Sequence, residues 1–580
     1  MYENIFIYNF IPNFLFGFFF IIINILFSIK VSKNNFVKKI FFFNEFQPII
    51  IYFLIFSFYV FIFNITIFIN YKLISKIFFI IFLLQILFII TNLKNYKSLI
   101  NFRFKIDEKL ILSIFFILFL ISILPLTDAD SISIYQYLPA TILNEGLKVI
   151  NINQNLEFTL LSNTEVLLLI SSILKSDNFG SQLNLVTLLF FIIINFKKHK
   201  NFSLIILSSP LLIYFISAQK LQLFFGILFL LSFVLINKDL LKKQRELFIF
   251  ILLLTFYSSG KLSYILFTVP LFIYFFYVYY KNWKIISLYS IISFVIVYFP
   301  LLALKQNYFG NILAPFCDNL LGQNLDSYNA FAHSIRSSEG WMSDPGNFSL
   351  YIRPFLSLDL SKLSSSLGLV FLLMLIDFKL QKKTKFLSII LIILVLATGQ
   401  IVPRYYFEAF LILAYYYQPK KFFVKLFVYS QVLIIFFISV VYIYFAYIKF
   451  DVVNDKLKYM NKFSYSFFNA QQLKKDNLNG NVLDFSLDRH SIFFDKNVYS
   501  LRYLQILNKY KNNINQNLND FILNNSIKYL IIDSNYQIPD CLITKEIKET
   551  YRKLAVRNFL IKPEKNKYKI IEIRDNKCTY

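Results

Sequence analysis

The sequence has little charge and very few cysteines, histidines and tryptophans. Of its 580 residues, 16% are charged, whereas about a quarter is usual for a soluble domain. Its three cysteines form no CxxC or CxxH pair, which argues against a metal or redox motif. The sequence also lacks a P-loop and an HExxH segment, so it carries no signature of an ATP-driven pump or a zinc peptidase.

Apolar residues dominate instead. Hydrophobic residues make up 57% of the chain and aromatic residues 20%, in repeated runs near the length that crosses a bilayer. We therefore predict a polytopic α-helical membrane protein with about 14 transmembrane helices, and 156–174 is either one more span or an interfacial helix. The predicted spans are 4–29, 48–69, 73–92, 109–126, 181–196, 202–218, 221–237, 247–260, 262–280, 284–304, 364–379, 386–401, 404–418 and 425–448.

Charge gives these spans an orientation. The net charge of +26 would suggest nucleic acid in a soluble protein. Here the basic residues cluster after every odd-numbered predicted helix, which is the positive-inside pattern, so we expect no nucleic-acid partner. The N-terminus and the loops 127–180 and 305–363 then lie outside. Ionisable residues within the spans are scarce, and Asp377 and Glu408 lie near helix ends, which disfavours an ion-coupled transporter.

The last part of the chain has a different composition. Residues 449–580 are polar and rich in asparagine, with β-like runs at 482–485, 529–532 and 568–573 and a helix-like stretch at 518–524. We predict two parts: a multi-spanning transmembrane domain, 1–448, and a C-terminal soluble α/β domain, 449–580, on the outer side.

A pair of carboxylates follows the fourth predicted helix. Asp128 and Asp130 are two residues apart at the predicted outer face. Such a pair can hold a divalent cation, or one member can act as a general base on a hydroxyl group. A structural alternative is that Asp128 caps a following helix that Gly146 ends. One Asp can cap while the other acts chemically, so the interpretations are compatible.

Two segments resemble the GT-C superfamily of membrane glycosyltransferases. The first is Asp128-Ala129-Asp130-Ser131 with Tyr135, Pro139, Leu143 and Gly146, although Gln136 stands where a histidine is expected. The second, Lys305-Gln306-Asn307 through Gly310-Asn311 to Pro315-Phe316, is similar to a tGNPxxP segment, with Ile312 in place of the first proline. The resemblance covers most of the chain in architecture and about 30 residues in motif.

The resemblance implies an enzyme of a bacterial inner (plasma) membrane with its N-terminus and C-terminal domain on the periplasmic side. It would transfer a sugar from a polyprenyl-phosphate-linked donor to a glycan or lipid-linked acceptor. Asp128 or Asp130 would activate the acceptor or bind Mg or Mn. Arg404, an arginine at an outer helix end, is the preferred phosphate ligand, with an interfacial anchor as the alternative. Arg336 and Arg353 are further candidate phosphate ligands. Lys220 and Lys261 lie in short outer turns, on the side where the positive-inside rule disfavours them, and each is either a phosphate ligand or a simple turn residue.

The remaining candidate residues lie in the outer loops, where they would contact the substrate: Tyr135, Asn307, Gly310, Asn311, His333 and Trp341. A first alternative function is an O-antigen-type polymerase or ligase that uses His333, Arg336 and Arg353. A second alternative is a lipid or glycan transporter, or a scaffold, with no enzymatic activity.

Overall fold

The chain is described by a computed structural model in seventeen segments. Trp341 and Asp377, both singled out above, lie outside the described residues. The described residues are 9–91, 106–128, 130–147, 156–195, 199–336, 349–356, 363–376, 382–398, 400, 402–419, 422–463, 480–485, 498–500, 516–533, 538, 542–553 and 565–576.

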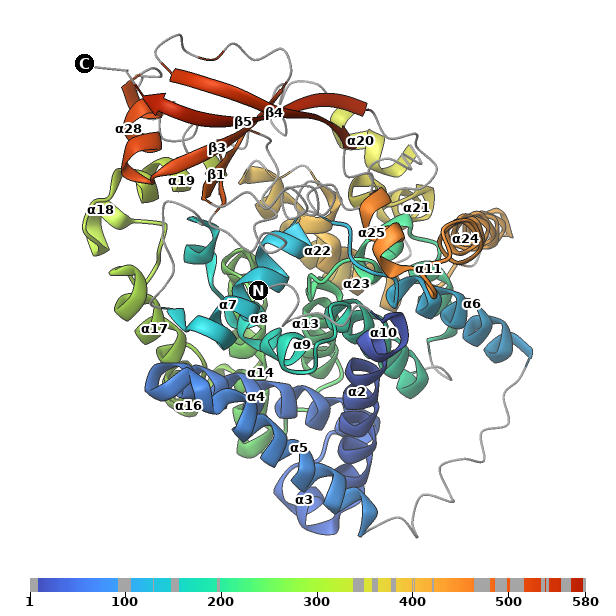
Figure 1. The fold of residues 1–580 in the computed structure, drawn as a ribbon. Coiled ribbons are helices and arrows are strands. Elements are labelled where there is room, and N and C mark those ends of the chain that lie inside the picture. The colour runs from blue at the N-terminus through green and yellow to red at the C-terminus, as the bar shows by residue number, and fades with distance from the viewer. Residues whose placement is uncertain are drawn as a thin grey trace.

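Helices make up most of the described chain before residue 464 (Figure 1). The helices of the first half are α2 (Phe10–Lys33), α3 (Asn35–Ile40), η1 (Asn44–Phe46), α4 (Gln47–Asn70), η2 (Tyr71–Leu73), α5 (Ile74–Ile90), α6 (Ile106–Ser122), the π-helix η5 (Ser131–Gln136), α7 (Tyr137–Glu145), η7 (Leu156–Leu160), α8 (Asn163–Leu167), α9 (Leu169–Ile173), α10 (Phe179–Asn195), α11 (Lys200–Leu207), α12 (Pro210–Ile216), α13 (Gln222–Asn237) and α14 (Gln244–Ser259). Those of the second half are η8 (Leu262–Tyr264), α15 (Ile265–Val278), η9 (Tyr280–Asn282), α16 (Trp283–Val297), α17 (Phe299–Phe309), α18 (Asp318–Leu321), α19 (Asp326–Arg336), α20 (Ser349–Leu356), η10 (Leu363–Ser365), α21 (Leu369–Ile376), α22 (Lys382–Ala397), η11 (Pro403–Tyr405), α23 (Phe407–Tyr416), α24 (Phe422–Ile443), η12 (Tyr444–Lys449) and α25 (Lys456–Phe463).

Every predicted span contains a helix, but few of these helices are long. Three described segments are long and apolar enough to cross a membrane: Phe10–Lys33, Asn44–Ile90 and Phe422–Lys449. A fourth candidate is the pair Leu262–Val278 and Tyr280–Val297, which is bent by 92°. The structure thus supports a helical protein with three or four candidate spans in its described residues, and the count of about 14 is not confirmed.

Two predicted spans are each divided into two helices. The range 202–218 breaks between α11 and α12, where Pro210 occupies the start of α12. The range 284–304 breaks after Val297, and α17 begins with Pro300 in its first turn. Proline has no backbone N–H to donate, so it suits a helix start and interrupts a continuous helix. The prediction of single helices was wrong at both places.

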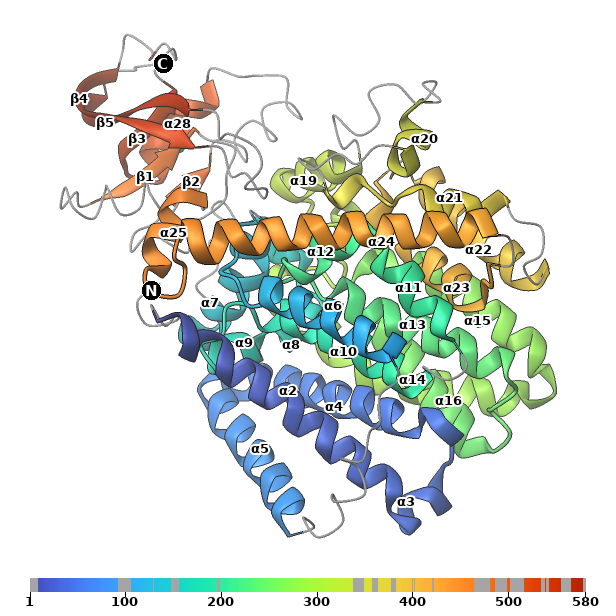
Figure 2. The same cartoon turned by 90° about the vertical axis from the view of Figure 1, so that its right-hand side faces the viewer.

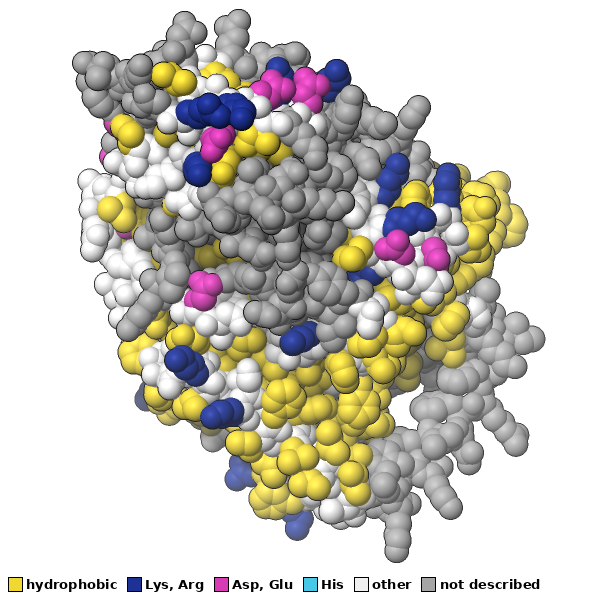
Figure 3. Space-filling view, viewed as in Figure 1, with side chains coloured by type: hydrophobic (Ala, Val, Ile, Leu, Met, Phe, Trp, Pro, Cys, Tyr) yellow, Lys and Arg dark blue, Asp and Glu magenta, His cyan; other side chains and the backbone are white. Residues whose placement is uncertain are grey.

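Large apolar side chains are exposed on several of the helices. On α5, Ile80, Leu83 and Leu84 are 59%, 56% and 61% exposed. Figure 3 shows hydrophobic side chains gathered over α2 and α5, whereas charged side chains gather over the sheet. Soluble proteins rarely expose contiguous apolar surface of this kind. The surface of α5 is therefore suited to contact with lipid.

The C-terminal part contains a mixed sheet of β1 (Asn481–Asp484), β2 (Val498–Ser500), β3 (Ile527–Asp533), β4 (Leu542–Lys553) and β5 (Lys565–Asn576), with the helix α28 (Gln516–Asn524). The strand order is β2-β1-β3-β5-β4, with parallel pairs around β1 and antiparallel pairs around β5. The three predicted β-like runs match β1, β3 and β5, and the helix-like stretch matches α28. A small C-terminal sheet is therefore confirmed.

Both faces of the strand β3 are buried. On β3, Tyr529 and Ile531 belong to the same apolar cluster as the helices, whereas Leu530 and Ile532 pack in a second cluster with Ile522 of α28. The alternation follows from the two-residue period of a strand. Figure 2 shows α24 along one side of the helices, with α25 at its end nearest the sheet.

A buried ion pair fastens α25 to the helices. The Lys456 ammonium lies 3.1 Å from the Asp177 carboxylate, and their side chains are 2% and 5% exposed. Asp177 also exchanges hydrogen bonds with the Asn13 side chain of α2. The Asp177 carbonyl accepts a hydrogen bond of 2.8 Å from Gln136 of η5. The start of the C-terminal part is thereby linked to the segment that carries Asp130.

We expect Lys456→Met to lower the free energy of unfolding by roughly 3–5 kcal/mol, because the Asp177 carboxylate stays buried without its cation. Thermal unfolding of the purified protein in detergent measures this loss. Lys458→Met changes an exposed lysine on the same helix and should leave the unfolding temperature close to that of the wild type. Equal behaviour of the two variants would contradict the anchoring role of Lys456.

Candidate functional site

Asp128 caps the helical segment that follows it. Its Oδ2 accepts hydrogen bonds from the Ser131 backbone N–H at 3.2 Å and from the Ser131 hydroxyl at 2.8 Å. The residue is 3% exposed. At the far end, Gly146 follows α7 with φ +72°, and a Cβ there would lie 2.8 Å from the Tyr71 ring. The structural alternative stated above therefore describes Asp128 and Gly146.

Asp130 has a different environment. Its side chain is 35% exposed and faces a cavity. Its Oδ2 accepts a hydrogen bond of 2.5 Å from the ammonium of Lys220, which belongs to the turn between α12 and α13. The same ammonium lies 3.9 Å from Asp128. The Gln219 N–H holds this turn against η5 by donating to the Ser131 hydroxyl at 3.0 Å. The turn thus carries Lys220 to the acidic pair.

Arg404 joins this group from η11. Its Nη1 donates a hydrogen bond of 2.5 Å to the Tyr214 hydroxyl, which also accepts one of 2.7 Å from Lys220. Its Nη2 donates to the Tyr405 hydroxyl at 2.9 Å, and Nη1 lies 4.0 Å from Asp130. The Tyr214 hydroxyl therefore bridges two cations that share one partly exposed carboxylate.

Lys261 adds a third cation. It follows Gly260 at the end of α14, and its ammonium lies 4.8 Å from the centre of the Tyr405 ring. Within the described part of the chain, no carboxylate lies within 4.0 Å of this ammonium. Lys261 and Arg404 thus meet at Tyr405, whereas Arg404 and Lys220 meet at Asp130.

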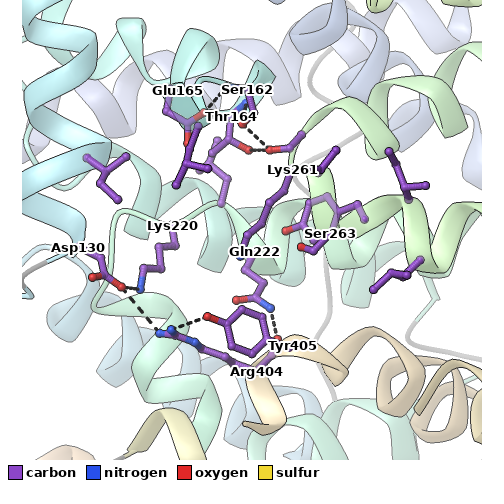
Figure 4. Close-up of a pocket in the computed structure, with 18 of the residues that line it drawn as sticks. Asp130, Ser162, Thr164, Glu165, Lys220, Gln222, Lys261, Ser263, Arg404 and Tyr405 are labelled. Atoms are coloured by element: carbon purple, nitrogen blue, oxygen red, sulfur yellow. Dashed lines mark hydrogen bonds and ion pairs between the residues drawn. The ribbon is translucent and has the colours of Figure 1, made fainter. Parts of the chain in front are cut away.

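These residues line one cavity of about 630 Å³ (Figure 4). Its cationic end holds Asp130, Lys220 and Arg404, and its other polar end holds Ser162, Thr164 and Glu165. Apolar residues complete the wall: Ile134, Leu160, Leu221, Leu262, Ile265, Leu266 and Phe316. The cavity can therefore accept a ligand that combines an anionic group, a hydroxyl-bearing group and an apolar chain.

The cations change the acidity of their neighbours. Burial alone would raise the pKa of Tyr405. The positive charges of Arg404 and Lys261 lower this pKa by more than burial raises it, so the net pKa is about 8. Burial also lowers the pKa of Lys261. Burial and Arg404 lower the pKa of Lys220, yet Asp130 beside it leaves the net pKa above its usual value. Lys220 is thus a permanent cation, and Tyr405 titrates near neutral pH.

Several predicted site residues contribute to this cavity. Asp130, Tyr135, Lys220, Lys261 and Arg404 all line it. The second sequence segment reaches it through Phe316, and the Lys305 ammonium donates to the Ala314 carbonyl of that segment at 2.9 Å.

Other predicted residues do not line the cavity. The side chains of Asn307, His333 and Arg353 are exposed elsewhere. Asn311 organises its own turn by bonding Asp318, and Gly310 ends α17 with φ +67°. Arg336 ends α19, and Trp341 lies outside the described residues.

The sequence interpretation missed Glu165, Tyr214 and Tyr405. Glu165 forms a capping box with Ser162: the Ser162 N–H donates to its Oε2 at 2.7 Å, and the Ser162 Oγ lies 2.5 Å from the same oxygen. The pattern Ser-x-x-Glu was readable in the sequence. No comparable signal marked Tyr214 among 39 tyrosines.

The predicted divalent-cation site at Asp128 and Asp130 does not fit this arrangement. Both carboxylates face the Lys220 ammonium, which a metal ion would have to displace. Among the described residues, no group of three or more His, Cys, Asp or Glu side chains is placed to hold a metal ion.

No family model, curated protein or solved structure matches this chain. Function is therefore inferred from the residues around the cavity.

We expect Tyr405 to ionise near pH 8. Ultraviolet absorption of the phenolate, followed against pH, should show this step in the wild type and lose it in Tyr405→Phe. Arg404→Gln should move the step to higher pH, because the cation that stabilises the phenolate is removed.

Tyr406→Phe is the matched control, since burial raises the pKa of Tyr406. This variant should keep the step near pH 8. A titration that persists in Tyr405→Phe would contradict the assignment.

Proposed function

We propose that this protein is a membrane glycosyltransferase that moves a sugar from a polyprenyl-phosphate-linked donor to a glycan or lipid-linked acceptor. The observation that carries the proposal is the presence of Lys220, Lys261 and Arg404 with one partly exposed carboxylate, Asp130, in a single cavity. The cations suit the donor phosphate, and the carboxylate suits an acceptor hydroxyl.

The phosphate would bind at the cationic end. Arginine presents a planar pair of donors that matches phosphate oxygens, and lysine adds a point charge. Lys261 forms no ion pair with a described carboxylate, so its charge is open to a ligand anion. The apolar wall of Leu262, Ile265 and Leu266 supports binding of the first units of a polyprenyl chain.

The reaction would be a direct displacement. A new bond forms between the acceptor oxygen and the anomeric carbon, while the bond from that carbon to the phosphate oxygen breaks and its electron pair stays on the phosphate. Arg404, Lys220 and Lys261 stabilise that charge. Asp130 takes the acceptor proton. An incoming phosphate competes for the Lys220 ammonium, which frees Oδ2 of Asp130 for this role.

The proposal extends to the membrane setting. The chain would cross a bacterial inner membrane about 14 times, with the cavity, the N-terminus and residues 449–580 on the periplasmic side. Lys220, Lys261 and Arg404 each lie beside a helix end. The positive-inside pattern of the basic clusters places these helix ends on the periplasmic side. The shared location of these residues at one cavity supports this orientation.

The alternative functions have less support. An O-antigen-type polymerase or ligase would use His333 and Arg353, whose side chains are exposed away from the cavity. A transporter of an anionic lipid or glycan could use the same cations but would need no base at Asp130.

The test is a mass-spectrometric profile of surface glycan and lipid-linked intermediates in a strain that lacks the protein and receives each variant at matched membrane level. Asp130→Asn should lower sugar transfer by about 100-fold or more, because the general base is lost. Arg404→Gln should also fail to restore the profile.

Arg353→Gln is the matched control for Arg404→Gln and should restore the sugar fully. Restoration by Asp130→Asn would contradict a catalytic base there and favour the transporter. Failure of Arg353→Gln together with restoration by Arg404→Gln would favour the polymerase or ligase.

A further inference from the structure

The polar end of the cavity opposite Arg404 is built around one hydroxyl group. The Ser162 Oγ lies 2.5 Å from Glu165 Oε2 and 2.7 Å from the Gly260 carbonyl oxygen, and it accepts a hydrogen bond from the Thr164 N–H at 3.3 Å. The Thr164 hydroxyl donates to the same Gly260 carbonyl at 2.5 Å. The start of α8 is thus fastened to the end of α14.

These contacts require one more proton than Ser162 has. A serine hydroxyl carries a single hydrogen and two acceptor sites. Its hydrogen can be donated either to the carboxylate of Glu165 or to the carbonyl of Gly260. Whichever oxygen does not receive it would then face the Ser162 Oγ with no hydrogen between the two oxygens. A proton on Glu165 resolves the conflict: Glu165 donates to Ser162, and Ser162 donates to Gly260. The Thr164 N–H uses the second acceptor site of Ser162.

The surroundings of Glu165 favour the protonated form. It is 5% exposed, and burial raises its pKa to about 7 against the opposing hydrogen bonds from Ser162. The ionisable groups that face it are Lys305 on α17, Tyr135 on η5 and Tyr264 on η8. The neighbouring helices α4 and α14 contribute the uncharged Asn64 and Ser259 beside α8.

The Gly260 carbonyl precedes Lys261 directly. A Cβ at Gly260 would lie 2.7 Å from the Phe225 ring. The Gly260 backbone therefore lies in close contact with that ring on one side and with the Ser162 and Thr164 hydroxyls on the other. The position of this turn sets where the Lys261 ammonium lies over Tyr405. Whatever holds Gly260 therefore holds one of the three cations of the cavity.

We infer that Glu165, through Ser162, is a positioning residue for the anion site: its protonated form fixes the Gly260 carbonyl and thereby keeps Lys261 at Tyr405. This inference rests on the proposed function, in which Lys261 binds the donor phosphate. When Glu165 loses its proton, Ser162 donates to the carboxylate and releases Gly260. The folded arrangement therefore weakens as the pH rises through about 7, and anion binding weakens with it.

The experiment measures binding of farnesyl methyl phosphate to the purified full-length protein in detergent between about pH 6 and about pH 9. This diester keeps one negative charge over that range, whereas a phosphate monoester titrates near pH 6. The wild type should bind about tenfold more weakly at the upper end, a change that one coupled proton can supply.

Glu165→Gln removes the titrating group and should lose the fall near pH 7, whatever its absolute affinity, because no carboxylate forms that could draw the Ser162 hydrogen away from Gly260. Tyr405 titrates in both proteins, so the difference between their pH profiles reports Glu165. Glu157→Gln, which changes a buried carboxyl of η7 outside the cavity wall, should keep the wild-type profile.

Thr164→Val provides a second variant that leaves Glu165 in place. It removes one of the two bonds to Gly260 and should weaken binding at every pH, and Thr164→Ser should restore it. A wild-type pH profile in Glu165→Gln, or full affinity in Thr164→Val, would overturn the inference. Absence of binding to the wild type at any pH would instead refute the proposed phosphate site.

Discussion

Three positive charges held in one small, partly buried cavity are the constraint on which this site depends. Lys220 and Arg404 share a single partly exposed carboxylate, Asp130, and Lys261 in the same cavity pairs with no described carboxylate. Like charges repel strongly where the effective dielectric constant is low, and a buried charge is costly unless it is paired. Tyrosine hydroxyls and rings offset part of this cost. An anionic ligand would offset more of it, and this supports the proposed phosphate-bearing substrate.

Breaks in the helices supply these residues. Lys220 lies in the turn after α12, Lys261 in the turn after α14 and Arg404 in the short helix before α23. The π-helix η5 starts directly after Asp130, and Asp128 caps it. Polar groups and irregular backbone are costly in an apolar surrounding unless they line a cavity or bond one another. These turns do both, so the same breaks that shorten the helices create the site.

The sequence predicted part of this arrangement. Lys220, Lys261 and Arg404 stood out because they lie on the side where the positive-inside rule disfavours them, and the structure brings them together with Asp130. Glu165 and Tyr214 carry no unexpected positive charge that would have marked them. Their roles depend on contacts with turns that are distant in the sequence. The β-like apolar runs predicted β1, β3 and β5, whereas the short strand β2 and the polar strand β4 were missed. Pro210 and Pro300, which divide two predicted spans, were visible in the sequence. The spans were predicted from hydropathy, which does not register the break that a proline makes in a helix.

The most direct test of the phosphate site is an electron cryomicroscopy structure of the protein bound to a non-transferable polyprenyl-phosphate-sugar analogue. The account predicts phosphate density within hydrogen-bond distance of Arg404 and Lys261, with the sugar toward Asp130 and the lipid chain along Leu262, Ile265 and Leu266. Phosphate density at another surface, with the three cations still bonded to Tyr214, Tyr405 and Asp130, would contradict it.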